Sequence, residues 1–270
     1  MLIIPYLLFL VHLSGFFCIL RVTADGFVTL CLRSFVCYTY AMDEMFQRTV
    51  SLIGEEALDR LRSSRVCIIG LGGVGSFAAE ACVRSGVGSL LLIDHDTVSA
   101  SNLNRQLCAL RSTVDLKKTA VLRERYLDIS PECRTDALDT FITSDNVGTL
   151  GLEGCDYVID AIDNITAKVA VASFLDETGV PHISVMGTGN KLRPERLRVS
   201  DIYSTNICPM ARAVRKLCRE KGIVSLRTVW SDETPVVRPG TPASMTFVPA
   251  SAGLLAAREA VLCLTGMQIG

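Results

Sequence analysis

Three glycines after an apolar run have the spacing of a phosphate-binding turn. Gly70, Gly72 and Gly75 fit G-x-G-x-x-G, follow the strand-like run 66–69, and precede a helix-like run over 76–84. A side chain in such a turn would block the tight bend and hold the backbone away from a phosphate. The helix N-terminus adds unpaired N–H groups and a positive dipole end. The stretch predicts an adenine-nucleotide site, and it does not separate NAD from ATP.

A carboxylate stands where the second strand of this unit would end. Residues 89–93 are strand-like and apolar, and Asp94 follows them, 19 positions after Gly75. An acidic residue at about this distance hydrogen-bonds a ribose hydroxyl in related nucleotide-binding units. We therefore expect Asp94 to contact the ribose.

The elements that would position these residues alternate between strand and helix. Further helices are predicted over 51–62, 116–129 and 166–177. Residues 157–164 are predicted to be a strand that runs into a polar turn, and residues 181–185 a further strand. Such alternation predicts a doubly wound, mostly parallel α/β sheet with a Rossmann-like nucleotide-binding half and ligands at the carboxyl ends of its strands. The polar stretch between Asp94 and Leu116 is a long loop, and loops of this length are usually functional.

Composition limits the class of protein. The 270 residues are 49% hydrophobic, enough for a full core, and the net charge of −1 gives no global attraction to nucleic acid or membrane. The 11 cysteines are scattered without a C-x-x-C pair, which favours free thiols in a reducing, cytoplasmic setting over a disulfide scaffold.

The N-terminus conflicts with that setting. Residues 1–20 contain no charged side chain and are long enough to cross a bilayer. No Lys or Arg precedes them, and Met42 lies just before a domain-like start. Two interpretations of residues 1–41 stay open: an extension from an upstream start site, or a membrane segment. The catalytic domain is expected over residues 43–265.

The polar motifs that follow the glycine turn resemble those of the E1-like adenylating enzymes, with the ThiF-type fold. The matching motifs are Gly70-Leu71-Gly72-Gly73-Val74-Gly75, Asp94-x-Asp96, Ser101-Asn102-x-Asn104-Arg105-Gln106, Lys118 and Asp160-Ala161-Ile162-Asp163-Asn164. The resemblance implies ATP with Mg²⁺, and a nucleotide site that includes Gly73 and Asp96.

Roles for single residues follow from the same resemblance. Asn102, Arg105 and Lys118 would contact the phosphates, and Asp163 would lie beside the magnesium ion. Arg48 matches an arginine that reaches the partner subunit's site, which implies a homodimer. Fixed cations suit adenylation because charge develops on the phosphoryl oxygens as a carboxylate displaces pyrophosphate. Taken singly, each of these side chains is also compatible with a solvated loop, a turn or a helix cap.

Within this superfamily the chain most resembles the tRNA threonylcarbamoyladenosine dehydratases. The likeness rests on residues 46–54, 187–192, 208–212 and 246–253. It implies that ATP activates the carboxylate of a threonylcarbamoyl group on tRNA, followed by cyclising dehydration. The alternatives are adenylation of the C-terminus of a ubiquitin-like sulfur carrier and, from another class, an NAD-binding dehydrogenase or a non-catalytic nucleotide-binding module. Cys208 is the only candidate for a thioester-forming cysteine in a loop-like setting.

A local basic stretch is the expected mark of a tRNA substrate. Residues 191–221 hold nine basic and three acidic side chains, a net charge of +6. They lie in a predicted substrate-binding insertion, residues 191–243, in which residues 228–241 are expected to be a flexible crossover. The residues expected to contact tRNA phosphates are Lys191, Arg193, Arg212, Arg215, Lys216 and Arg219. A solvated helix face is the alternative for the last four.

Overall fold

The computed structural model describes residues 8–13, 16–22, 28–30, 44–237 and 242–268. The chain divides into two compact units, residues 1–52 and 53–270. In the first unit, β1 (Leu8–Leu13), β2 (Phe16–Val22) and β3 (Val28–Leu30) form an antiparallel sheet. Most of residues 1–41 lies outside the described residues, so both interpretations of that segment stay predictions.

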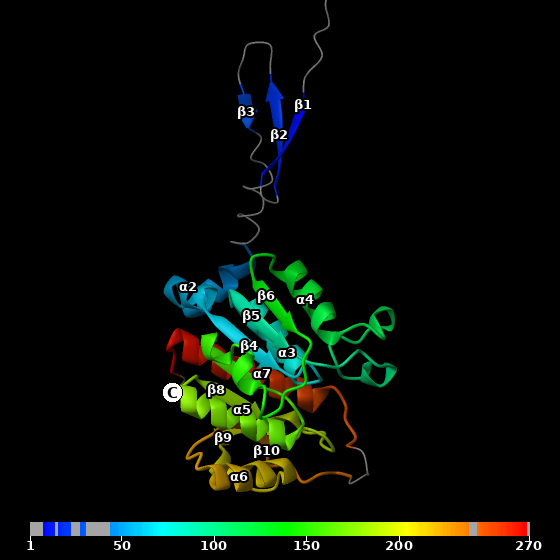
Figure 1. Cartoon of the computed structure of the whole chain (residues 1–270), viewed down its shortest axis with the longest axis vertical. Helices are drawn as coiled ribbons and strands as arrows, with labels where there is room; N and C mark the ends of the chain where they lie inside the picture. Colours follow the sequence, from blue (N-terminus) through cyan, green and yellow to red (C-terminus); the bar gives the residue numbers. More distant parts are fainter. Residues whose placement is uncertain (1–7, 14–15, 23–27, 31–43, 238–241, 269–270) are drawn as a thin grey trace, which may run out of the picture. The chain divides into compact units, whose positions relative to one another are not determined.

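The second unit is built on a seven-stranded sheet. Its strands are β4 (Arg65–Ile69), β5 (Ser89–Ile93), β6 (Arg134–Leu138), β7 (Tyr157–Asp160), β8 (His182–Val185), β9 (Leu197–Asp201) and β10 (Arg227–Ser231). Their order is β6-β5-β4-β7-β8-β10-β9, and only β9 runs antiparallel to its neighbour (Figure 1). The chain moves outward from β4 to β6 and returns to β7 on the other side of β4. The β4–β7 border is therefore the switch point at which such sheets bind ligands.

Helices cover both faces of this sheet. The helices are α2 (Glu55–Ser63), α3 (Gly75–Ser85), α4 (Lys118–Ile129), α5 (Ile165–Thr178), α6 (Pro209–Lys221) and α7 (Phe247–Thr265). Val66 and Ile68 of β4 join the core formed with α2, α3, α4 and α7, whereas Cys67 and Ile69 join the core formed with α5. Alternate residues of one strand thus fill two cores, which explains its uninterrupted apolar sequence. The prediction of a doubly wound, mostly parallel α/β fold is confirmed.

Helix α7 packs in the core against α3. Of the helices in the described residues, it alone is long and apolar enough to cross a membrane. Its residues Ala252, Ala256 and Ala260 are nevertheless fully buried among the residues of the first core. Gly253 permits this packing, since a Cβ there would lie 2.3 Å from the Val74 carbonyl oxygen. One side of this helix thus belongs to the core of the main unit.

Residues 191–237 complete the main sheet. They supply β9, α6 and β10, and β10 pairs with β8 in parallel. The expectation of a flexible crossover beginning at Thr228 was wrong for residues 228–231, because Thr228, Val229 and Trp230 are buried in a regular strand. The prolines and charges that suggested a loop begin only after Ser231. Because the segment was judged as a whole, the short β-branched run before them was not recognised as a strand.

Candidate active site

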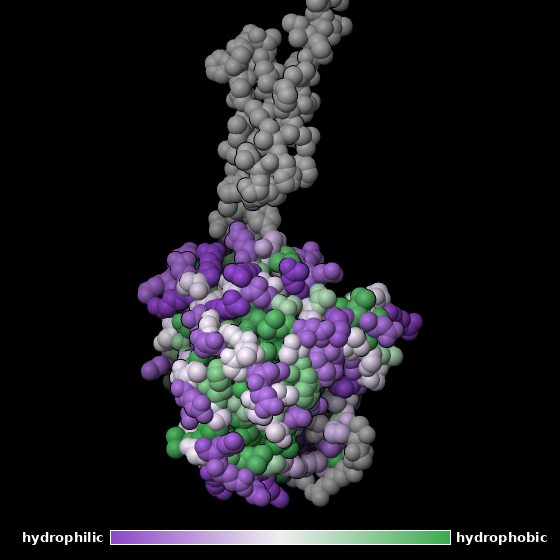
Figure 2. Space-filling model, in the orientation of Figure 1, coloured by the Kyte–Doolittle hydropathy of each residue, from purple (hydrophilic) through white to green (hydrophobic). Residues whose placement is uncertain are grey.

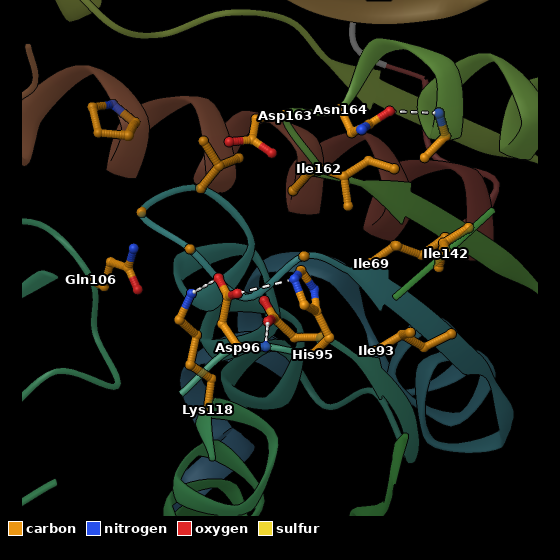
Figure 3. A pocket seen from close by; sticks show the side chains of 18 of the residues that line it. Ile69, Ile93, His95, Asp96, Gln106, Lys118, Ile142, Ile162, Asp163 and Asn164 are labelled. Carbon is orange, nitrogen blue, oxygen red and sulfur yellow. Dashed lines mark hydrogen bonds and ion pairs between the residues drawn. The ribbon is translucent and has the colours of Figure 1, made fainter. Parts of the chain in front are cut away.

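One cavity, with a volume of about 260 Å³, lies at the carboxyl ends of β4, β5 and β7. Most of the predicted nucleotide-binding residues line it: Gly70, Gly72, Gly73, Asp94, Asp96, Arg105, Lys118 and Asp163. Lys118 and Asp96 lie on one side, while Ile69, Ile93 and Ile142 lie on another (Figure 3). The cavity therefore offers an apolar region and a region of fixed charge, as a nucleotide with a flat base and a phosphate chain requires.

The glycine turn is shaped by two close backbone approaches. Gly70 has φ +84°, and a Cβ there would lie 3.0 Å from the backbone of Ala161. Gly75, the first residue of α3, does not line the cavity, and a Cβ on it would lie 1.8 Å from the Gly70 carbonyl oxygen. The structure thus gives Gly75 a packing role that brings α3 against the turn.

Asp94 fastens this turn to the end of β5. Its Oδ2 accepts a hydrogen bond from the Leu71 N–H at 2.6 Å, and its Oδ1 accepts one from the Asp96 N–H at 2.8 Å. The carboxylate is buried but lines the cavity, and each oxygen keeps acceptor capacity for a further donor. Its contact with a ribose stays a prediction.

Lys118 brings a buried ammonium group to the cavity wall. Its side chain is 5% exposed, and its Nζ lies 2.7 Å from Oδ2 of Asp96. The other oxygen of Asp96 lies 3.2 Å from Nε2 of His95 (Figure 3). Burial acts to raise the pKa of Asp96, but the hydrogen bond and charge of Lys118, with His95 and Lys117, outweigh burial and lower that pKa below its usual value. Asp96 therefore stays ionised and holds Lys118 in place.

The loop before α4 carries Arg105 into the wall and uses Asn102 to hold its own shape. Arg105 donates to the Ser101 carbonyl oxygen and to Oδ1 of Asn104, both at 2.9 Å. Asn102 does not line the cavity, and its Oδ1 accepts from the Ser99 N–H at 3.1 Å. The predicted phosphate contact of Asn102 thus has no direct support in this geometry.

Two sets of lining residues were missed by the sequence interpretation. Gln106 presents its amide to the cavity (Figure 3), and its place beside Arg105 in the polar motif was the available signal. Thr140, Phe141 and Ile142 line the apolar region, and the Phe141 ring meets that of His95 edge-on with centroids 4.8 Å apart. They follow β6, a strand that begins with the consecutive polar residues Arg134, Thr135 and Asp136 and so gave no apolar run to detect.

Asp163 projects from the turn between β7 and α5. It is exposed and lines the cavity, and its carboxylate makes no hydrogen bond or ion pair with any residue that the structure describes. Next to it, Oδ1 of Asn164 accepts from the Ala167 N–H at 2.9 Å and caps α5. Asp163 therefore has the free acceptor capacity that a cation bound with a phosphate chain requires.

Besides Asp163, the cavity wall has a second group of possible metal ligands, which consists of Asp94, His95 and Asp96. Their potential ligand atoms lie within 4.8 Å of one another. Each oxygen of Asp94 already accepts from one backbone N–H, and the two oxygens of Asp96 already face Lys118 and His95.

The residues expected to contact tRNA fall into two groups. Arg193, Arg212, Lys216 and Arg219 are exposed. Lys191 is instead 4% exposed, with its Nζ 2.8 Å from the Gly187 carbonyl oxygen, and burial lowers its pKa. Arg215 donates to the carbonyl oxygen of Thr205 at 2.9 Å and so supports the turn before α6. Lys191 and Arg215 are thus built into the fold.

Two further side chains bear on the predicted chemistry. Cys208 is 1% exposed, so the expectation of a loop-like thiol was wrong. It is the N-cap residue of α6 and packs among Met186, Ala211 and Val214. Arg48 is exposed in the helical residues 44–53 and belongs to the unit of residues 1–52, so its reach into a partner's site stays a prediction.

Comparison with known proteins decides the family. The model of the ThiF family matches residues 46–269. The chain belongs to the ThiF family. This ThiF-family chain is 40% identical over 242 residues to the tRNA threonylcarbamoyladenosine dehydratase of Bacillus subtilis (strain 168), covering 83% of this chain and 95% of the relative. The resemblance found in the sequence is therefore confirmed.

Solved structures agree with this assignment. The crystal structure of the Escherichia coli tRNA N6-threonylcarbamoyladenosine dehydratase in complex with ATP matches this ThiF-family chain with a TM-score of 0.81 and 37% identity. The match covers 84% of this chain and 96% of that one. The same enzyme in complex with AMP matches with a TM-score of 0.81 and 36% identity, over the same shares.

Proposed function

We propose that this chain is an ATP-dependent tRNA threonylcarbamoyladenosine dehydratase. One observation carries the proposal: the glycine turn, Arg105, Lys118 and Asp163 line one cavity in a chain that matches ATP- and AMP-bound dehydratases over nearly their whole length. A dehydrogenase or a binding module would not need two cations and a free carboxylate together on the wall of one cavity. A cytoplasmic location is part of the proposal.

The chemistry follows from charge. The carboxylate of the threonylcarbamoyl group attacks the α-phosphate of ATP, and pyrophosphate leaves. Lys118 and Arg105 lie where they would stabilise the negative charge that develops on the phosphoryl oxygens. The activated acyl group and its nucleophile belong to the same modified nucleoside, so ring closure that expels AMP is intramolecular and needs no cysteine of the protein.

The residues present fit a magnesium ion bound together with ATP. Mg²⁺ is usually held by one or two carboxylates with substrate phosphates and water, and Asp163 supplies one free carboxylate on the cavity wall. When bound, the ion would neutralise charge on the phosphates. Asp163 would hold it from the side of the cavity opposite to Lys118 and Asp96 (Figure 3).

The proposal is tested by measuring pyrophosphate release with four additions: tRNA carrying threonylcarbamoyladenosine, unmodified tRNA, a ubiquitin-like carrier protein, and buffer. We expect release only with the modified tRNA, with a cyclised nucleoside and AMP as products. Release with the carrier alone would establish the sulfur-carrier alternative instead. Binding of NADH without binding of ATP would overturn both.

We further propose a homodimer in which Arg48 completes the partner's site. Arg48→Ala and Asp163→Ala are each expected to be inactive when pure. Every site of the first variant would lack a cation, and every site of the second would lack a metal-binding carboxylate. A mixture after subunit exchange should recover part of the activity, since some hybrid sites contain both residues. Exchange confirmed by labelled subunits without any recovered activity would place Arg48 outside the partner's site.

The exposed basic residues of α6 are proposed to contact tRNA phosphates. Hydrophilic residues dominate the outer surface of this helix (Figure 2), and Arg212 makes no ion pair with the described residues. Removing two phosphate contacts by the double change Arg212→Ala and Lys216→Ala should make the slope of log affinity against log salt shallower by about 1.8. ATP affinity should be unchanged.

A matched double change removes two arginines elsewhere, Arg84→Ala in α3 and Arg134→Ala in β6, and should leave the salt slope unchanged. If both double variants made the salt slope shallower by the same amount, the change would come from net charge and not from contacts made by α6. Arg215 is unsuitable for this test because its loss would also release the turn at Thr205.

A further inference from the structure

A lysine and an aspartate are completely buried beneath the turn that carries Asp163. Lys168 is 0% exposed and Asp160 is 1% exposed, and their Nζ and Oδ2 atoms lie 2.8 Å apart. Asp160 is the last residue of β7, and Lys168 lies in the first turn of α5. Neither side chain lines the cavity, so no step described above uses this pair.

Ser184 of β8 closes the pair into a network. Asp160 and Ser184 face each other in the sheet, and the Ser184 hydroxyl donates to Oδ2 of Asp160 at 2.7 Å. Lys168 donates to the Ser184 Oγ at 3.1 Å and reaches the Asp160 carbonyl oxygen at 3.5 Å. All three protons of the ammonium group thus have acceptors, and a fully satisfied buried network of this kind is rigid.

Stability alone is a poor explanation for this pair. Desolvating two charges costs several kcal/mol for each ion, and well-packed apolar residues often replace a buried pair without loss. Lys168 also lies near the N-terminus of α5, where the helix dipole disfavours a cation. Its neighbours Ala167 and Val169 are buried, so an apolar residue would suit the position. The contact that Asp160 makes with the turn before Asp163 offers a further explanation for the pair.

The second carboxylate oxygen of Asp160 binds the turn that leads to Asp163. Oδ1 of Asp160 accepts from the Ile162 N–H at 3.2 Å, while the Ala161 N–H donates to the Ile69 carbonyl oxygen at 2.8 Å. On the other side of Asp163, the Lys168 N–H donates to the Asn164 carbonyl oxygen at 2.9 Å. Ile162, before Asp163, is therefore tied to the side-chain network through Asp160, whereas Asn164, after Asp163, is held by the backbone of α5.

We propose that Lys168, Asp160 and Ser184 form a buried positioning network that fixes where Asp163 presents its carboxylate to the metal–ATP complex. The inference rests on the proposed magnesium role of Asp163. Lys168 neutralises and orients Asp160, Ser184 fixes the same carboxylate from β8, and Asp160 in turn holds the Ile162 N–H. These three are positioning residues, because none of them touches the nucleotide cavity.

The test measures how many fold Mg²⁺ strengthens ATP binding, by calorimetry with ATP in MgCl₂ and in EDTA. Groups that orient a metal-binding side chain typically contribute about 10- to 100-fold in metal affinity. We expect Ser184→Ala and Lys168→Met to reduce the Mg²⁺ factor by about 10-fold or more. Binding of metal-free ATP should change by less than about 2-fold, since Lys118 and the glycine turn are intact. The Mg²⁺ concentration for half-maximal pyrophosphate release should rise in parallel.

Thr135→Val is the matched control for Ser184→Ala. Thr135 lies in β6, the strand at one edge of the sheet, and its buried hydroxyl donates a hydrogen bond to the Cys133 carbonyl oxygen, so this change also removes one bonded hydroxyl. This variant should keep the wild-type Mg²⁺ factor. An equal fall in the melting temperature of the two variants, with a changed Mg²⁺ factor only for Ser184→Ala, supports positioning over general destabilisation.

Asp163→Ala separates this inference from the proposed function. If Asp163→Ala abolishes the Mg²⁺ factor while Ser184→Ala and Lys168→Met keep it, the positioning network is overturned and the metal role of Asp163 stands. If Asp163→Ala keeps the factor, the metal role fails and the inference fails with it, while pyrophosphate release with modified tRNA still decides the activity. Should Lys168→Met not fold, Ser184→Ala decides alone.

Discussion

Replacing Lys118 by Ala is expected to lower kcat/KM for pyrophosphate release by about 10²- to 10³-fold. Lys118 is the most deeply buried cation on the cavity wall, with a side chain 5% exposed, so little water screens its charge. The substitution also leaves the carboxylate of Asp96 without its partner 2.7 Å away. The phosphates would then meet the uncompensated carboxylate of Asp96 beside Asp94, where the wild type has Asp96 neutralised by Lys118.

The adjacent lysine provides a matched control. Lys117 is half exposed, lies 2.9 Å from Asp139 and does not line the cavity. Lys117→Ala should therefore keep kcat/KM within about 3-fold, because an exposed ion pair contributes little. Steady-state pyrophosphate release with modified tRNA measures both variants. Similar losses in the two would indicate that α4 as a whole is disturbed and that Lys118 has no special part in phosphate binding.

The nucleotide half of the fold was predictable because its signals are local. The apolar runs 66–69 and 89–93 and the glycine turn can each be recognised from a few consecutive residues. The structure has β4 and β5 at the two runs and the start of α3 at the turn. The motif around Asp163 was also recognisable, and it lines the same cavity as Lys118, 45 positions earlier. Parallel strands bring distant residues together because their carboxyl ends share one edge of the sheet.

What the sequence did not reveal depends on tertiary contacts. Arg215 lies at helical spacing from Arg212 and Arg219, which suggested one basic face, but its side chain folds back to the turn at Thr205. Lys168 stands among apolar residues and reads as an ordinary helix residue, since its partners Asp160 and Ser184 come from two different strands. Spacing along one helix cannot show which charge is exposed and which is bonded.

Gly75→Ala is expected to lower the free energy of unfolding by about 3 kcal/mol or more, the upper part of the range for overpacking. At the start of α3, Ala would ordinarily favour the helix by about 1 kcal/mol over Gly, so the predicted sign is opposite to helix propensity. The reason is that the new Cβ would lie 1.8 Å from the Gly70 carbonyl oxygen and 3.2 Å from the Ile68 side chain. Backbone cannot move aside there without opening the turn. Urea unfolding of the purified protein measures the loss.

Gly72→Ala in the same motif should behave in the opposite way. A Cβ on Gly72 would meet only the flexible Gln106 amide, at 3.7 Å, so the free energy of unfolding should change by less than about 1 kcal/mol. Gly72 does line the cavity, so the added methyl group should instead weaken ATP binding by keeping the phosphates from the turn. If Gly72→Ala lost stability but kept normal ATP affinity, Gly72 would have a packing role. If Gly75→Ala kept its stability but lost ATP affinity, Gly75 would have a phosphate-binding role. Either result would contradict the roles assigned here to the two glycines.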